Sequence, residues 1–209
     1  MVLQMQLAEN PDMSTTPRPM PASTVEPGSQ PYGNYWTWAA LAVALAGVAG
    51  SLWLSVGMDL KACALCFYQR SFVMGIAAVL AVGLVARVNR PGLVSLLCLP
   101  MLVAGLWIAA VHTNLVREGK LECPNGVFGW GSAPSQSLTV YLILAAMLAV
   151  DVVSSGAMQE ILPRVAAIAI GAAVAYGCLH SNPPPKAATG PDQPLDECRK
   201  PYVAPGPNP

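Results

Sequence analysis

The sequence predicts an all-α integral membrane protein, a four-helix transmembrane bundle with an extra fifth transmembrane helix. Hydrophobic residues make up 54% of the chain and charged residues only 11%, and the mean hydropathy is +0.49. Several apolar runs approach or reach the roughly 20 residues that cross a bilayer core of about 30 Å. The formal net charge is zero and no basic cluster is present, which argues against a nucleic-acid-binding protein.

Five apolar runs are the expected spans, at about 35–56, 67–86, 92–112, 138–153 and 165–179. The first three are long and apolar, and the fourth is short but rich in Leu, Ile and Val, with Tyr141 available as an interface anchor. The fifth run consists mostly of Ala and Gly. It presents little apolar surface, but such small residues suit close helix packing inside a bundle.

Two tails flank the bundle. Residues 1–34 are rich in Pro, Ser, Thr and Met, and we expect a disordered cytoplasmic tail there rather than a cleaved signal, with the first span as an uncleaved anchor. Residues 35–180 form the helical bundle. Residues 181–209 are Pro-rich, which predicts an extended and stiff periplasmic tail.

Five spans that alternate in direction sort the cysteines by membrane face. Four of the six come to one shared face: Cys63, Cys66, Cys123 and Cys198. Cys98 lies inside the third span, where a free cysteine packs as a small hydrophobe, and Cys178 lies near the shared face at the end of the fifth.

Charge alone does not orient the chain. The loop 87–90 carries two arginines, which favours the cytoplasm, but cations also collect on the opposite face. Disulfides persist in oxidising compartments, so the face with four cysteines is expected outside the cytoplasm.

A Cys-x-x-Cys motif, Cys63 to Cys66, lies where the second span begins, with Arg70 four residues further on. The positive end of a helix dipole lowers the pKa of a thiol, and the arginine adds a fixed positive charge beside Cys66. Such a thiolate can attack a disulfide or pass electron density to an oxidant. A Zn site is the alternative, although a second Cys or His pair is missing. Covalent haem attachment would need His where Phe67 stands.

The stretch 60–70, Leu-Lys-Ala-Cys-Ala-Leu-Cys-Phe-Tyr-Gln-Arg, resembles the signature of the bacterial disulfide bond formation protein B (DsbB) family. That family places its Cys-x-x-Cys between spans one and two and a second cysteine pair after span three, where this chain has Cys123. His112-Thr113 resembles a family His-Thr near the quinone pocket. The resemblance covers about residues 35–153. Vitamin K epoxide reductases do similar chemistry, but their Cys-x-x-Cys comes late in the bundle.

The resemblance implies a multi-pass bacterial inner-membrane thiol:quinone oxidoreductase with its redox cysteines facing the periplasm. Such an enzyme reoxidises a periplasmic thioredoxin-like (DsbA-like) dithiol oxidase and passes two electrons to ubiquinone or menaquinone. Cys66 would be the quinone-proximal thiolate, with Arg70 and His112 at the quinone. Cys63 would form the disulfide with Cys66, and Cys123 would be attacked by the partner. No metal is implied.

One departure from the family pattern concerns the second cysteine pair. The loop 118–137 contains Cys123 alone, so we expect Cys198 to supply the missing partner, carried to the same face by the fifth span. The Pro-rich tail extends by about 3.1 Å per residue, so reach is not limiting. If the fifth segment does not cross the membrane, Cys198 lies on the wrong side. Cys178 would then have to pair with Cys123, or the mechanism would use one cysteine.

Two other functions remain open from the residues. One is a non-catalytic membrane protein whose outward cysteines bind Zn or form permanent disulfides, and the other is a helix-bundle transporter or electron conduit. Arg70 favours the enzyme, because a cation beside the thiols serves a thiolate–quinone pair and gives nothing to a structural disulfide. A conduit would also need cysteines buried within two spans.

Overall fold

The computed structural model describes residues 33–88, 92–154, 161–188, 190 and 194–203, so almost all of the expected N-terminal tail lies outside the described residues. The described part is helical and contains no β-strand. Its long helices are α1 (Gly33–Val56), α2 (Ala64–Val85), α3 (Leu93–Arg117), α4 (Ala133–Ser154) and α5 (Ile161–His180), with a short 3-10 turn, η1 (Val127–Gly129), before α4. All five are long and apolar enough to cross a membrane, which confirms the predicted helical membrane bundle.

Each helix extends beyond its expected apolar run at one end or at both. Helix α4 begins at Ala133, before the expected start at 138, and α5 begins at Ile161 instead of 165. Each starts just before a proline, Pro134 and Pro163, which the first turn of a helix tolerates because its N–H groups have no intrahelical partner. The first turn of α4 includes Ser135 and Gln136, so hydropathy alone does not detect it.

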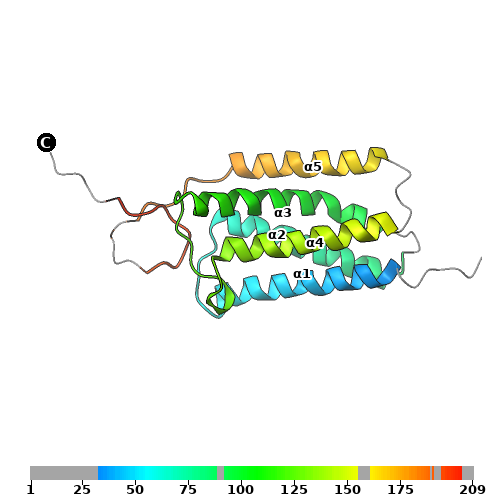
Figure 1. Cartoon of the computed structure of the whole chain (residues 1–209), viewed down its shortest axis with the longest axis horizontal. Coiled ribbons are helices and arrows are strands. Elements are labelled where there is room, and N and C mark those ends of the chain that lie inside the picture. The colour runs from blue at the N-terminus through cyan, green and yellow to red at the C-terminus, as the bar shows by residue number, and fades with distance from the viewer. Residues whose placement is uncertain (1–32, 89–91, 155–160, 189, 191–193, 204–209) are drawn as a thin grey trace, which may run out of the picture. The chain divides into compact units, whose positions relative to one another are not determined.

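Helix α3 lies at the centre of the packing. It packs against α2, α4 and α5, while α1 packs against α2 and α4 (Figure 1). The main buried cluster is built of aliphatic side chains from these helices, including Ile76, Leu80, Leu102, Leu144 and Leu148.

Close approach of α5 to α3 depends on a glycine. A Cβ on Gly171 would lie 2.6 Å from the carbonyl oxygen of Pro100 and 2.7 Å from Cβ of Val103. Real side chains do not approach so closely, so glycine at this position lets the two helices meet. Small residues therefore serve the close packing that the sequence predicted for the fifth span.

Two buried hydrogen bonds tie α4 to neighbouring helices. The hydroxyl of Ser95 on α3 donates to Asp151 on α4, with 2.5 Å between the oxygens, and both residues are buried. The hydroxyl of Tyr141 on α4 donates to the backbone carbonyl of Gln69 on α2 at 2.6 Å. Hydrogen bonds of this kind fix the register of neighbouring helices in an apolar environment.

The C-terminal tail returns to the end of the bundle that carries the α1–α2 and α3–α4 loops (Figure 1). Lys61 N donates to the carbonyl of Asp196 at 2.8 Å, and the two side chains form an ion pair of the same length. Glu122 and Arg199 exchange two backbone hydrogen bonds of 2.8 and 3.0 Å. The tail thus docks between the two loops, with Cys198 between its two points of attachment.

Candidate active site at the cysteine cluster

The Cys-x-x-Cys motif forms the first turn of α2. Cys63 is the N-cap, and its sulfur accepts a hydrogen bond from the backbone N–H of Cys66 at 3.3 Å. Both cysteines are free and half-buried, and their sulfurs lie 3.1 Å apart. The motif therefore places two thiols at the positive end of the helix dipole, where a thiolate is favoured.

Cys123 and Cys198 form a disulfide across 75 residues, the pairing that the sequence predicted. Cys198 is buried, at 7% exposure, whereas Cys123 is half-buried. The sulfurs of Cys63, Cys66 and Cys198 and a ring nitrogen of His112 all lie within 4.8 Å of one another. A dithiol and a disulfide are thus close enough for exchange after small movements. The other free cysteines are Cys98, which is buried as predicted, and Cys178.

His112 is fully buried among these sulfurs. Its Nε2 lies 3.4 Å from the sulfur of Cys123 and 4.0 Å from the sulfur of Cys63. Its Nδ1 lies 3.3 Å from Nε2 of Gln69. The imidazole is therefore held from one side by α2 and directed toward the cysteines on the other.

The surroundings lower the pKa of Cys63 to about 5. The largest cause is the hydrogen bond from the Cys66 thiol, and a hydrogen bond from His112 acts in the same direction, while partial burial opposes them. In the dithiol form Cys63 is therefore the thiolate at neutral pH. This charge distribution belongs to the reduced pair, because a sulfur in a disulfide does not ionise.

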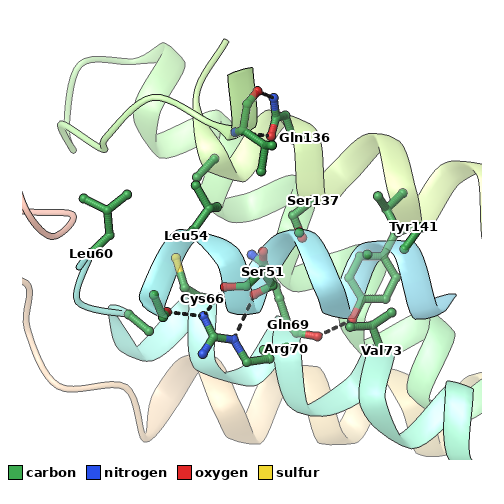
Figure 2. Close-up of a pocket in the computed structure, with 18 of the residues that line it drawn as sticks. Ser51, Leu54, Leu60, Cys66, Gln69, Arg70, Val73, Gln136, Ser137 and Tyr141 are labelled. Atoms are coloured by element: carbon green, nitrogen blue, oxygen red, sulfur yellow. Dashed lines mark hydrogen bonds between the residues drawn. The ribbon is translucent and has the colours of Figure 1, made fainter. Parts of the chain in front are cut away.

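A cavity of about 560 Å³ lies beside the motif between α1, α2 and α4. Most of its lining is apolar. The polar side chains around it include Ser51, Ser55, Gln69, Arg70 and Gln136, and the sulfur of Cys66 lies on its wall (Figure 2). A mostly apolar cavity of this size with a few polar groups is typical of small-molecule sites. Cys63 and His112 do not line it, so of the residues expected at the quinone the cavity includes Cys66 and Arg70.

Arg70 is held in place by α1. Its Nε donates to the hydroxyl of Ser51 at 2.8 Å, and its Nη2 donates to the Ser51 carbonyl at 2.8 Å and the Ser55 hydroxyl at 2.6 Å (Figure 2). These bonds fix the guanidinium at the cavity wall one turn after Cys66. A cation held in this way can stabilise negative charge on a thiolate or on a ligand oxygen.

Sequence reasoning missed the residues that support this site. Ser51 and Ser55 lie four residues apart on an otherwise apolar helix, and that spacing on one face was the available signal. Gln69 lies inside the stretch 60–70 that resembles the family signature, but it was assigned no role from the sequence. Gln136 lines the cavity and holds the backbone of Val127: its side chain accepts from Val127 N at 2.8 Å and donates to Val127 O at 3.0 Å. Nothing in the sequence around Gln136 indicated these bonds.

Three cysteines and a histidine are also the ligand types of a Zn site. In the structure the sulfur of Cys198 is bonded to Cys123, so a four-ligand site with Cys63, Cys66 and His112 would require the disulfide to be reduced first.

Residues 34–136 match the family model described as "Disulfide bond formation protein DsbB". The match runs from α1 to the first turn of α4 and includes the Cys-x-x-Cys, Arg70, His112 and Cys123. It covers neither α5 nor the tail with Cys198. No curated protein and no solved structure matches the chain. This match assigns the segment 34–136, which carries the Cys-x-x-Cys and Cys123, to the DsbB family of disulfide bond formation proteins.

Proposed function

We propose that the protein is a thiol:quinone oxidoreductase of the bacterial inner membrane, with its cysteine cluster facing the periplasm. It would reoxidise a DsbA-like dithiol oxidase and pass two electrons to ubiquinone or menaquinone. One observation carries the proposal: a dithiol and a disulfide share one cluster, and two of its cysteines, Cys66 of the dithiol and Cys198 of the disulfide, line an apolar cavity.

The partner attacks first at Cys123. This sulfur is half-buried whereas Cys198 is buried, so an incoming thiolate reaches Cys123 more easily. The Cys123–Cys198 bond breaks, a mixed disulfide forms between the partner and Cys123, and Cys198 leaves as a thiolate. The ion pair and backbone bonds of the docked tail keep this thiolate beside the Cys-x-x-Cys motif.

Cys198 then attacks the Cys63 sulfur of an oxidised Cys63–Cys66 pair. Cys66 leaves as a thiolate on the cavity wall, one turn before the guanidinium of Arg70. The partner's second thiol releases Cys123, which attacks Cys198 and restores the Cys123–Cys198 disulfide. The two electrons now reside on Cys63 and Cys66, and this is the arrangement of bonds in the structure.

The cavity fits a quinone. Its lining is mostly apolar, as a ring and isoprenoid chain require, and Arg70 provides a fixed donor for a ring oxygen. Quinone, when bound, supplies the oxidising power by accepting two electrons. The chain contributes the Cys66 sulfur on the cavity wall, the positive charge of Arg70 and a lining of apolar side chains.

The test is quinone reduction by the purified full-length protein supplied with a reduced thioredoxin-like dithiol. We expect Cys66→Ser, Cys123→Ser and Cys198→Ser each to abolish turnover, because each breaks the chain of exchange. Cys178→Ser is the matched control and should retain full activity, since this cysteine forms no disulfide. Full activity of Cys198→Ser would remove the tail from the reaction.

A second candidate is a non-catalytic protein that holds Zn, favoured by the three sulfurs and one imidazole within 4.8 Å of one another. It predicts stoichiometric Zn in the purified protein and no quinone reduction by the wild type with a competent dithiol. Turnover without bound Zn would exclude it.

A further inference from the structure

We propose that His112 is a catalytic residue of the internal exchange: its Nε2–H donates a hydrogen bond in turn to Cys123 and Cys63, the two sulfurs between which negative charge moves. This inference rests on the proposed function and adds to it. It gives the imidazole a role at the cysteines and not at the quinone, because His112 does not line the cavity.

The three exchanging sulfurs are arranged around this one nitrogen. Cys198 is the central sulfur, bonded to Cys123 and within 4.8 Å of Cys63. The outer sulfurs, Cys123 and Cys63, lie 3.4 and 4.0 Å from His112 Nε2. In attack of a thiolate on a disulfide, the charge starts on the incoming sulfur and ends on the leaving sulfur. Because Nε2–H of His112 lies near both of these sulfurs, it can donate first to the attacking sulfur and then to the leaving sulfur.

The partner of the other ring nitrogen selects the tautomer. An amide nitrogen can only donate, so Gln69 Nε2 donates to His112 Nδ1 across 3.3 Å. A neutral imidazole that accepts at Nδ1 carries its hydrogen on Nε2, which faces the sulfurs. Gln69 is buried, and its backbone carbonyl accepts from Tyr141 at 2.6 Å, so the residue that orients the ring is itself held by α4.

The step balances without an added reactant. The Cys123 thiolate attacks Cys198 of the Cys198–Cys63 disulfide, the Cys123–Cys198 bond forms, the Cys198–Cys63 bond breaks, and Cys63 leaves as a thiolate. No proton moves between heavy atoms, and Nε2–H changes its acceptor from one sulfur to the other. His112 is fully buried, and a hydrogen bond to a charged group is stronger where water is excluded.

The experiment uses quinone-free full-length protein with both cysteine pairs oxidised, mixed with one equivalent of a reduced thioredoxin-like dithiol. Acid quenching, alkylation and mass spectrometry follow the mixed Cys63–Cys198 disulfide and its conversion to the Cys63–Cys66 dithiol. We expect His112→Leu to slow this conversion about 10- to 100-fold, the effect of losing a hydrogen bond to a charged group. His112→Gln keeps a donor and should recover most of the rate. His180→Leu, at the exposed end of α5, is the matched control and should behave as wild type.

A second readout separates a donor from a packing residue. The pH dependence of Cys63 alkylation in the reduced protein should move upward in His112→Leu and stay near wild type in His112→Gln. Equal conversion rates in wild type and His112→Leu, or a glutamine variant no faster than the leucine variant, would overturn the inference. If His112→Leu does not fold, Gln69→Leu takes its place: at least threefold slower conversion supports the inference and an unchanged rate refutes it. Absence of quinone reduction by the wild type is a different result, which refutes the proposed function itself.

Discussion

Gly105 on α3 is the position where the smallest substitution should have a large effect. A Cβ at this residue would overlap the ring of Tyr141, its Cε1, Cζ and hydroxyl oxygen alike. Tyr141 is 1% exposed, and its hydroxyl is held by the backbone carbonyl of Gln69. Gly105→Ala therefore forces the ring, or α3 itself, to shift.

The expected cost has two parts. An extra methyl group in a packed core costs about 1–3 kcal/mol. Displacing the ring also breaks the 2.6 Å bond from Tyr141 to the Gln69 carbonyl, and a buried acceptor left without its partner costs about 1–3 kcal/mol more. Together the free energy of unfolding should fall by about 2–6 kcal/mol.

The assay is unfolding of the detergent-solubilised protein by increasing sodium dodecyl sulfate, followed by circular dichroism. Gly177→Ala is the matched control, because a Cβ at Gly177 on α5 meets nothing within 4 Å. The control should be neutral or stabilise by less than about 1 kcal/mol. In a Tyr141→Ala background the added cost of Gly105→Ala should largely vanish, because the overlapping ring is gone. A Gly105→Ala variant as stable as the control, or a cost unchanged without the ring, would refute the reasoning.

Three further predictions concern the cysteine end of the bundle. In the reduced protein, alkylation of Cys63 should increase with pH through about 5 and level off by neutral pH, because its pKa is lowered to about 5; a midpoint near the ordinary thiol value of about 8.5 would contradict this. Asp196→Ala removes the ion pair to Lys61 but keeps the backbone hydrogen bond, so the Cys123–Cys198 disulfide should still form. Because an exposed ion pair contributes little, dithiothreitol should reduce this disulfide less than about threefold faster than in the wild type. Loss of the disulfide on a non-reducing gel would show that the ion pair is essential. Gln136→Leu removes the hydrogen bonds that hold the loop over the cavity, so a fluorescent quinone analogue should bind at least about fivefold more weakly, and unchanged binding would exclude this loop from the site.

Much of the architecture was accessible from sequence because it depends on composition. A run of about 20 apolar residues has few alternatives to a membrane-length helix, and alternation of direction then places Cys63, Cys123 and Cys198 at one end. The pairing of Cys123 with Cys198 was expected from the resemblance to DsbB proteins, which have a second cysteine pair after the third span, together with the side of the membrane to which five spans bring Cys198.

The contacts that hold the site residues in place could not be predicted from the sequence, because they depend on which faces the helices turn toward one another. Gln69 and Tyr141 are 72 residues apart, and only the rotation of α2 and α4 brings them together. The position of His112 illustrates the same limit. Its place at the end of the third span was visible, but whether it faces the cavity or the cysteines is set by the rotation of α3.

The long-range disulfide also has a mechanical consequence. The bond between Cys123 and Cys198 closes residues 123–198 into a covalent ring that contains α4 and α5. Reduction opens the ring, and α5 is then retained by its contacts with α3, where Gly171 meets the Pro100 carbonyl, and by the polar bonds of the docked tail. In the proposed reaction cycle this bond opens at every turnover, so noncovalent contacts must keep α5 in place while it is open.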